Sequence, residues 1–318
     1  MTAPLRLRPV FKERPWGGRR LAERFGYDLP EGRIGECWGI SAHPNGPSTV
    51  VSGEHAGRTL PEVWEADPAF FGHPDDEEFP LLVKLLDARE WLSVQVHPDD
   101  AQAARLEGEP RGKTECWYVV AAEPGAQLVI GHRAADREQL AACIDAGAWD
   151  DLLLRREVAA GDFVHVPSGT IHALGPGVLV CEVQQSSDTT YRVYDWDRVD
   201  AQGRRRELHL DKAKEVATVP YDPAVTDTAA DPEVVAGGRR RLLVDGEHFA
   251  VTLHEVRGEG YRVPVDRYEL WTVVAGSGTA ALDGSSHPLR AGDHLILPAG
   301  AGDVSLAGEV TIVAAVAA

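Results

Sequence analysis

The sequence predicts a mainly β protein in which two similar units follow one another. Three observations indicate this. Short runs rich in β-branched and aromatic residues recur between Gly, Pro and Asp turns along most of the 318 residues, helical patterns are fewer, and two stretches of the first half recur in the last third. Many short strands with turn residues between them are typical of a sandwich or a barrel.

The predicted strands are apolar runs bounded by turn residues. In the first two thirds of the chain they are 80–86, 91–97, 116–122, 126–132, 162–168 and 177–183. In the last third they are 241–246, 249–256, 270–276, 293–300 and 310–316. Helical periodicity is found at 60–71, 99–109, 137–154 and 207–217, and we expect these helices as insertions on the β scaffold.

The two units carry related motifs. TECWYVV (114–120) matches YELWTVV (268–274), and AGDFVHVPSGTIH (160–172) matches AGDHLILPAGAGD (291–303). Between the units lies a stretch rich in Asp, Pro, Ala and Gly without a steady period, which is typical of a linker. We therefore predict a first domain at 1–217, a linker at 218–240 and a second domain at 241–318.

A Gly turn that feeds a strand ending at Pro-x-Gly suggests the fold of both units. Gly161, Pro167, Gly169 and His172 form the pattern G-x5-P-x-G-x2-H, which resembles the second motif of cupins. The resemblance implies two tandem cupin domains, each a double-stranded β-helix or jelly roll. The second copy has Asp303 in place of His172, so we expect a degenerate domain that has lost its metal.

Charge and composition limit the partners. Fifty acidic and 32 basic residues give a net charge of −18, which argues against nucleic acid or an anionic membrane surface as a partner. No run approaches the roughly 18 apolar residues of a membrane span, and the N-terminus lacks the apolar region of a signal peptide. We expect a cytoplasmic protein, and an anionic substrate would have to be met by a few local cations.

The stretch WLSVQVHPDD (91–100) contains the first candidate site residues. Side chains alternate faces along a strand, so Ser93, Gln95 and His97 share one face while the valines share the other. The cupin resemblance implies that His97, Glu115 and His172 bind a metal, with Gln95 as a weaker fourth ligand. Two imidazoles and one carboxylate suit zinc and also non-haem iron(II), and the ligand set alone does not choose between them.

Several long blocks carry a closer resemblance, which covers about two thirds of the chain. They are RPWGG (14–18), GECWGISAHPNG (35–46), PLLVKLLDAREWLSVQVHPDD (80–100), GKTECWYV (112–119), VPSGTIHAL (166–174), EVQQSSDTTYRVYDWDR (182–198) and RELHLDKA (206–213). In this order they resemble the short bacterial type of class I mannose-6-phosphate isomerase.

The family resemblance implies an aldose-ketose isomerase that interconverts D-mannose 6-phosphate and D-fructose 6-phosphate through a cis-enediol. It implies one zinc ion per chain, bound by Gln95, His97, Glu115 and His172. Arg192 falls on the family's catalytic arginine. The remaining expected site residues are Lys113 as a second catalytic cation and Glu182, Asp188, Arg198 and Ser93 as substrate-binding residues.

Two other functions remain open at this point. One is an iron(II) cupin oxygenase, against which Gln95, Lys113 and the SDTTYR block argue, because an oxygenase needs an apolar pocket rather than cations. The other is a catalytically silent sugar-binding regulator, against which the intact ligands and Arg192 argue. The sequence does not identify the general base or the range of substrates, and for the assembly we expect a monomer or a weak homo-oligomer.

Overall fold

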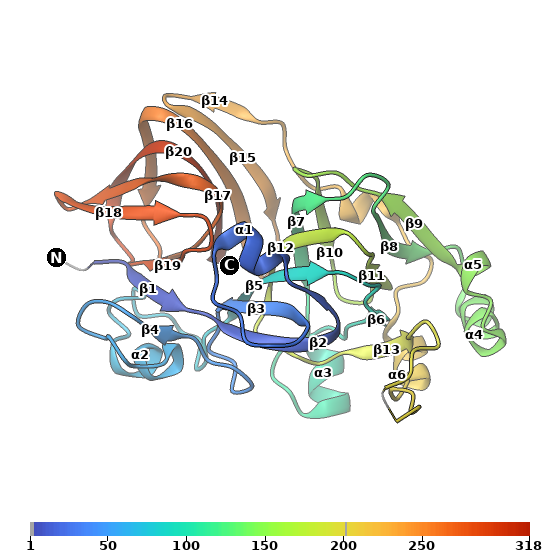
Figure 1. The fold of residues 1–318 in the computed structure, drawn as a ribbon. Coiled ribbons are helices and arrows are strands. Elements are labelled where there is room, and N and C mark those ends of the chain that lie inside the picture. Colours follow the sequence, from blue (N-terminus) through green and yellow to red (C-terminus); the bar gives the residue numbers. More distant parts are fainter. Residues whose placement is uncertain (1–2, 201) are drawn as a thin grey trace.

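Strands dominate the computed structural model, which describes residues 3–200 and 202–318. The strands form three antiparallel sheets, so the predicted mainly β class is confirmed. In Figure 1 the strands of the last third (orange to red) form one unit on the left, and most strands of the first two thirds form another on the right. None of the described helices is long and apolar enough to cross a membrane.

The first unit consists of two facing sheets. The six-stranded sheet has the order β10 (Phe163–Val166), β7 (Glu115–Ala122), β12 (Val178–Gln185), β5 (Leu81–Ala88), β2 (Val10–Gly18) and β3 (Ile34–Ile40). The five-stranded sheet has the order β13 (Tyr191–Tyr194), β6 (Val94–Val96), β11 (His172–Leu174), β8 (Gln127–His132) and β9 (Leu153–Glu157).

One core lies between these two sheets. It brings Leu86, Trp117 and Val180 of the six-stranded sheet together with Leu128 and Ile130 of the five-stranded sheet. All five side chains are at least nine-tenths buried. Burial of this apolar surface stabilises the pairing of the sheets, and the facing layers form the jelly roll that the motifs predict.

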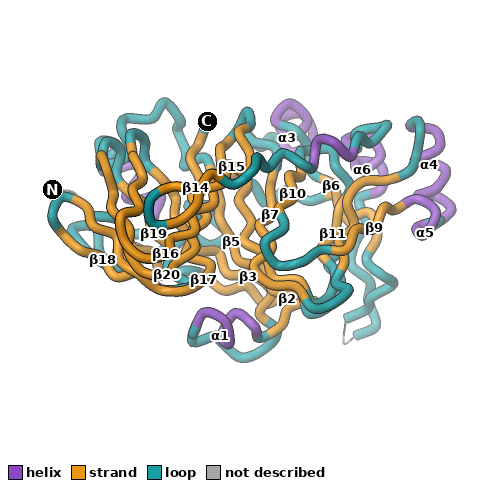
Figure 2. The backbone as a smooth tube through the Cα atoms, turned by 90° about the horizontal axis from the view of Figure 1, so that it is seen from above, coloured by secondary structure: helices purple, strands orange, loops and turns teal. Residues whose placement is uncertain are grey.

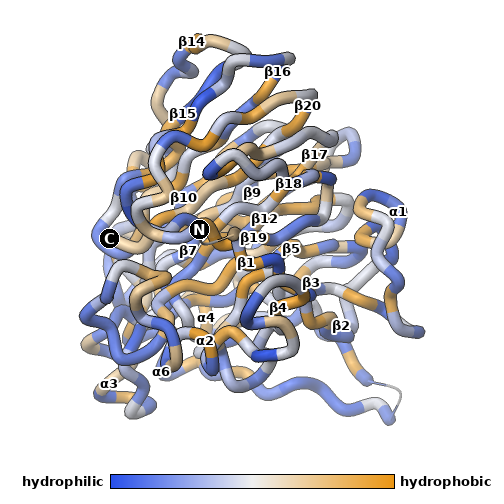
Figure 3. The backbone as a smooth tube through the Cα atoms, turned by 90° about the vertical axis from the view of Figure 1, so that its left-hand side faces the viewer, coloured by the Kyte–Doolittle hydropathy of each residue, from blue (hydrophilic) through white to orange (hydrophobic). Residues whose placement is uncertain are grey.

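The nine-stranded sheet forms the second unit. Its order is β14 (Glu233–Val235), β15 (Gly238–Asp245), β16 (Phe249–Val265), β20 (Gly302–Ala317), β17 (Glu269–Leu282), β19 (His294–Leu297), β1 (Leu5–Arg8) and β4 (Thr49–Val50), with β18 (Ser285–Arg290) paired to β17. Strands β16 and β20 run side by side, and hydrophilic and hydrophobic residues alternate along them (Figure 3).

The helices lie at the outside of the strand layers (Figure 2). They are α1 (Arg20–Phe25), α2 (Leu60–Ala66), α3 (Asp100–Glu107), α4 (Arg137–Ala146), α5 (Trp149–Leu152), α6 (Leu210–Val216) and the 3-10 helix η1 (Pro223–Thr226). The predicted helix at 137–154 is interrupted, because Gly147 adopts a left-handed conformation that ends α4. The last residues of that segment begin strand β9 instead.

The N-terminal segment belongs to both units. Strand β1 pairs with β19 of the second unit, while β2, which follows it directly, pairs with β3 in the first. The two units are therefore joined by β-sheet hydrogen bonds as well as by the chain between them. The division at 1–217, 218–240 and 241–318 stays a prediction.

Candidate active site and metal centre

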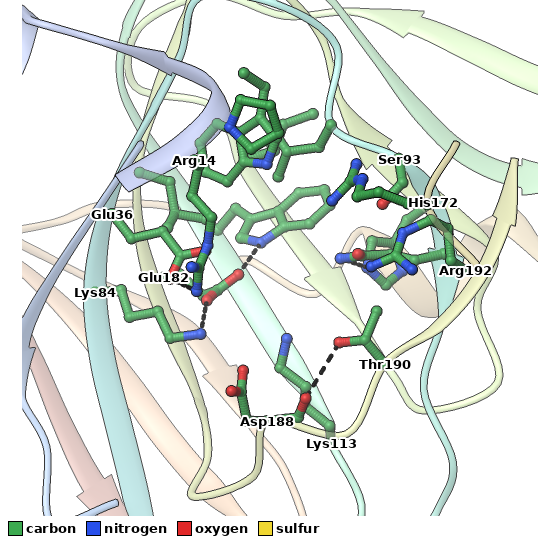
Figure 4. A pocket seen from close by; sticks show the side chains of 18 of the residues that line it. Arg14, Glu36, Lys84, Ser93, Lys113, His172, Glu182, Asp188, Thr190 and Arg192 are labelled. Atoms are coloured by element: carbon green, nitrogen blue, oxygen red, sulfur yellow. Dashed lines mark hydrogen bonds and ion pairs between the residues drawn. The ribbon is translucent and has the colours of Figure 1, made fainter. Parts of the chain in front are cut away.

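A cavity of about 430 Å³ lies between the two sheets of the first unit (Figure 4). One cross-strand row of each sheet lines it. In the five-stranded sheet His172 is paired with Gln95, and Gln95 with Arg192. Directly paired residues in neighbouring strands present their side chains on the same face. These three polar side chains therefore meet at one wall of the cavity.

The opposite wall is the corresponding row of the six-stranded sheet. Trp117 is paired with Glu182, and Glu182 with Lys84. Glu115 lies two residues before Trp117 on strand β7, so both side chains project from the same face of the sheet, toward the interior. The side chains of Glu115 and Glu182 are almost completely shielded from solvent.

Three predicted ligands converge beside the cavity, and one of them, His172, lines it. His172 Nε2 lies 3.2 Å from Glu115 Oε1, and His97 Nε2 lies 3.5 Å from Glu115 Oε2. One ligand atom from each residue falls within 4.8 Å of the others, and all three residues are buried. The atoms could therefore contact one ion.

The protonation of both imidazoles suits a cation. His97 Nδ1 is 2.8 Å from the Thr189 carbonyl oxygen, and His172 Nδ1 is 2.8 Å from that of Thr170. Because a carbonyl oxygen only accepts, each Nδ1 carries a proton, and in the neutral ring the Nε2 lone pair then lies on the side of Glu115. Burial lowers the pKa of His97 well below its ordinary value and keeps its ring neutral.

Glu115 supplies the negatively charged ligand of the candidate metal site. Both of its carboxylate oxygens are fully enclosed and lack a well-aligned hydrogen-bond donor, although the Lys113 ammonium lies 2.7 Å from Oε2. Burial opposes ionisation, yet the charge of the neighbouring Lys113 ammonium holds the pKa of Glu115 well below its ordinary value. An enclosed carboxylate beside two imidazole lone pairs fits a divalent cation.

Gln95 fits as the fourth ligand after a rotation of its amide. Its Nε2 lies 3.2 Å from His172 Nε2 and donates an amide N–H to the imidazole lone pair, the same lone pair that an ion would use. Exchanging the amide oxygen and nitrogen, which have nearly the same shape, turns the oxygen toward the ligand atoms. An oxygen at this position suits a metal better than the nitrogen does.

The cavity is rich in cations although the chain is acidic. Five cationic side chains line it: Arg14, Lys84, Lys113, Arg192 and Arg206. Lys84 lies 3.3 Å from Glu182, Arg14 lies 2.7 Å from Glu36, and Arg206 is paired with Asp195. Arg192 has no acidic partner among the described residues, and its Nε is buried without a hydrogen bond. It is the cavity cation best placed to meet an anion.

The other predicted site residues are divided between the cavity and its surroundings. Ser93, Glu182 and Asp188 line the cavity, and Glu182 also accepts a hydrogen bond of 3.0 Å from Trp117 Nε1. Arg198 is not among the lining residues, because its guanidinium instead contacts the Trp91 carbonyl oxygen and Asp195. Arg206 takes a place on the lining that the sequence did not predict.

Arg14, Glu36 and Lys84 were also missed. Arg14 and Glu36 lie on β2 and β3, which carry no strand pattern long enough to be recognised. Lys84 lies within a run of apolar residues whose side chains are all buried. A charge at such a position is rare unless it is paired, so this lysine was the available signal for a buried polar wall.

Comparisons with known proteins agree over the whole chain. Two family models match it: phosphomannose isomerase type I, catalytic domain, over residues 5–118, and mannose-6-phosphate isomerase, cupin domain, over residues 240–317. The mannose-6-phosphate isomerase of Streptococcus mutans is 45% identical over 314 residues, which cover 99% of this chain and 98% of that protein.

Solved structures show the same relationship. The crystal structure of the mannose 6-phosphate isomerase from Bacillus subtilis superposes with a TM-score of 0.95 at 44% identity, covering 99% of this chain and 100% of that one. A mannose 6-phosphate isomerase bound with zinc and yttrium superposes with a TM-score of 0.79 at 16% identity, covering 99% of this chain and all of that one, which is a likeness of fold alone.

Proposed function

This chain belongs to the type I mannose-6-phosphate isomerases, and from this membership we propose that it works with one zinc ion bound by His97, Glu115, His172 and Gln95. The reaction interconverts D-mannose 6-phosphate and D-fructose 6-phosphate through a cis-enediol. The observation that carries the proposal is the convergence of two imidazole lone pairs and one enclosed carboxylate within 4.8 Å. A fold relative bound with zinc supports the choice of ion.

The reaction moves a proton from one carbon of the sugar to its neighbour, and negative charge develops on the sugar oxygens between the two transfers. Bound zinc supplies a Lewis acid that stabilises this charge, which is worth several kcal/mol. The residues of the chain do the rest: they bind the phosphate, orient the sugar and stabilise charge outside the metal centre.

Arg192 is the proposed catalytic arginine. Its guanidinium faces the cavity without a carboxylate partner among the described residues, so its charge is available to the substrate. Burial, and then the neighbouring charge of Arg206, lower the pKa of Arg192, which shows that its charged form is poorly solvated here. An anion beside it would relieve that cost. We assign it to the developing charge or the phosphate.

Lys113 is the second proposed cation. Burial disfavours its ammonium, but Glu115 and Glu182 raise its pKa above the ordinary value, so it stays charged beside the metal ligands. It lies on the cavity lining between the two walls, close to Glu182 and Asp188 (Figure 4). These two carboxylates and Ser93 are positioned to hydrogen-bond sugar hydroxyls. Arg198 does not line the cavity, and its predicted role in substrate binding stays a prediction.

The oxygenase alternative uses the same ligand set but a different cavity. Five cationic side chains suit a phosphorylated substrate, whereas an iron(II) oxygenase needs an apolar pocket open to oxygen. The intact ligands likewise argue against a silent regulator. A cytoplasmic location and a monomer or weak homo-oligomer remain predictions.

The proposal is tested with purified full-length protein. The metal content per chain is measured by atomic emission, and fructose 6-phosphate formation from mannose 6-phosphate is followed before and after treatment with a chelator. We expect one zinc per chain, loss of turnover on its removal, and recovery when zinc is added back. Full turnover in protein that contains no metal, or recovery with iron(II) but not with zinc, would contradict the proposed cofactor.

A further inference from the structure

The second unit contains a cavity of its own, of about 440 Å³. Strands β15, β16, β17 and β20 supply most of its lining, and the segment before β15 supplies its rim. Polar lining residues are Asp231, Glu233, Arg240, Thr252, His254 and Glu269. The apolar walls are Leu242, Val263, Pro264, Ala314 and Val316.

Strand register identifies this cavity as the counterpart of the active site. In the first unit Glu182 is paired with both Lys84 and Trp117. In the second unit Ala314 is paired with both Thr252 and Trp271. Ala314 therefore occupies the position of Glu182, and Thr252 that of Lys84. Glu269 precedes Trp271 by two residues, as Glu115 precedes Trp117.

The same register shows what the second cavity lacks. The pair of Gln95 and His172 corresponds to Pro264 and Asp303. Proline has no side-chain ligand atom, and Asp303 is mostly exposed and lies 3.6 Å from Arg262. The charged pair Lys84–Glu182 is replaced by a hydroxyl and a methyl group. The counterparts of Gln95, His172 and Lys84 are thus lost from the second cavity, whereas Glu269, the counterpart of Glu115, and the space remain.

His254 supplies a polar group that the first cavity does not have at this position. It takes the place of Leu86, two residues along the strand from Thr252, and only 6% of its surface is exposed. The Tyr261 hydroxyl donates to the Arg239 carbonyl oxygen at 3.2 Å, so His254 Nδ1, 2.9 Å from the same hydroxyl, must be the donor. The proton is fixed on Nδ1.

The other ring nitrogen of His254 is therefore an acceptor. Nε2 has no hydrogen-bond partner among the described residues, and the ring lines the cavity. Burial lowers the pKa of His254 to about 4, so the ring is neutral at pH 7. Nε2 is open to the cavity rather than fully enclosed, so a ligand hydroxyl that donates to it would take the place of solvent.

Glu269 offers a second contact in the same cavity. Its Oε2 accepts a hydrogen bond of 2.7 Å from Trp271 Nε1, which leaves Oε1 for a ligand. Burial raises the pKa of this carboxyl group, and its Oε1 can accept a hydrogen bond from a ligand hydroxyl. Thr252 adds a hydroxyl on the neighbouring wall.

The charges at the rim decide the class of ligand. Arg240 is bonded to Glu233 at 2.6 Å, and Asp231 remains as an additional negative charge. A phosphorylated or carboxylated ligand would be repelled by this excess negative charge, and the lining that the structure describes has no unpaired cation to bind it. The interior offers the Thr252 hydroxyl, the neutral His254 ring and one carboxyl group beside apolar walls, and a few polar groups in an apolar cavity are typical of sites for small organic molecules.

We propose that the second cavity binds a small uncharged polyhydroxy compound, the class of unphosphorylated hexoses and hexitols. One hydroxyl donates to His254 Nε2, a neighbouring hydroxyl bonds to Glu269 or Thr252, and the carbon-bound hydrogens contact Val263, Ala314 and Val316. This site is separate from the metal centre and does not depend on the activity proposed there.

The test measures binding of D-mannitol to the full-length metal-loaded protein by isothermal titration calorimetry. Mannitol has no carbonyl group and cannot be isomerised. The titration is repeated with the Arg192→Ala variant and in the presence of mannose 6-phosphate. These two repeats distinguish mannitol binding in the second cavity from binding in the active site. We expect a mannitol complex that persists in both, because the second cavity contains neither Arg192 nor a cation free for the phosphate.

Two variants alter the second cavity in different ways. His254→Leu removes the acceptor and should weaken mannitol binding by about tenfold, the factor expected for one hydrogen bond; leucine is the residue that the first unit carries at this position, as Leu86. Ala314→Leu fills the cavity and should abolish binding. The matched control His287→Leu, on strand β18 outside the cavity, should bind as the parent does.

Thermal unfolding of each variant establishes that it is folded. The proposal is overturned if the parent protein does not bind mannitol, or if folded His254→Leu and Ala314→Leu both bind it with unchanged affinity. It is also overturned if mannitol is displaced fully by mannose 6-phosphate, because binding would then belong to the active site.

Discussion

His172 Nε2 lies 3.2 Å from Glu115 Oε1, although the two residues come from different sheets of the first unit. His172 begins β11 of the five-stranded sheet, and Glu115 begins β7 of the six-stranded sheet. The proposed metal centre therefore spans the space between the layers. An ion bound to both residues would link the two sheets, so metal binding and stability of the first unit should be coupled.

Replacing His172 by alanine tests this coupling. His172→Ala removes one of two imidazole ligands, so we expect loss of bound metal, loss of turnover and a lower unfolding temperature than the metal-loaded parent. The control His287→Ala makes the same chemical change on strand β18 of the second unit. Metal content, turnover and thermal unfolding are measured on both. A His172→Ala variant that keeps one zinc per chain would show that His172 is not a ligand.

Replacing Arg192 by alanine separates charge stabilisation from metal binding. Arg192 lies on the cavity wall beside the ligands but does not belong to the cluster of ligand atoms. We expect Arg192→Ala to retain the metal and to lose about 10²–10³-fold in kcat, the loss typical of a group that stabilises developing charge. Arg205→Ala, whose guanidinium is exposed and paired with Asp197, is the control. Parental kcat in Arg192→Ala would refute the assignment.

Lys84 and Glu182 form a buried ion pair, so the effect of replacing one on the free energy of unfolding should depend on whether the other is present. Their side chains are 5% and 4% exposed, and Glu182 Oε2 has no hydrogen bond to replace the ammonium. Lys84→Met leaves a buried carboxylate without its counter-charge, which costs about 3–5 kcal/mol. Adding Glu182→Gln, which keeps an acceptor for Trp117, should recover much of that loss. Urea unfolding of the parent, the two single variants and the double variant gives the coupling energy between the two residues. Strictly additive effects on the free energy of unfolding would contradict a paired role.

The residues that the sequence predicted as metal ligands lie together in the structure, and they could be singled out because their motifs are local. Gln95 and His97 share one face of one strand, and His172 follows a turn motif that is recognisable in one chain segment. Cross-strand rows such as Trp117, Glu182 and Lys84 depend on which strands become neighbours. That pairing is a property of the folded chain, and no spacing along the sequence encodes it.

Arg198 illustrates the limit of inferring a site residue from its place in a family-like sequence block. Strand β13 ends at Tyr194, and Trp196 and Asp197 then adopt positive φ angles of 57° and 55°. Non-glycine residues rarely take this conformation. The turn carries Arg198 away from the cavity, six residues after Arg192, which remains on its wall. The N-terminal strands β2 and β3 were missed because neither carries an apolar run or an alternation long enough to be recognised.

A final prediction concerns acid stability and the junction of the two units. His294 of β19 is completely buried; its Nε2 lies 3.0 Å from the Tyr27 hydroxyl and its Nδ1 3.0 Å from Thr272 Oγ1. Burial lowers the pKa of His294 to about 3, from an ordinary value of 6.5. Between these values the unfolded chain binds a proton that the folded chain does not.

The free energy of unfolding should therefore fall as the pH falls from about 6.5 toward 3, and one pKa unit corresponds to about 1.4 kcal/mol. At pH 5 the contribution of His294 is on the order of 2 kcal/mol. His294→Gln cannot titrate, so its urea midpoint should change less between pH 7 and pH 5 than that of the parent. His287→Gln controls for the general effect of removing a histidine. An equal acid shift in His294→Gln and the parent would show that protonation of this ring does not limit stability, because the only difference between them is the group that titrates.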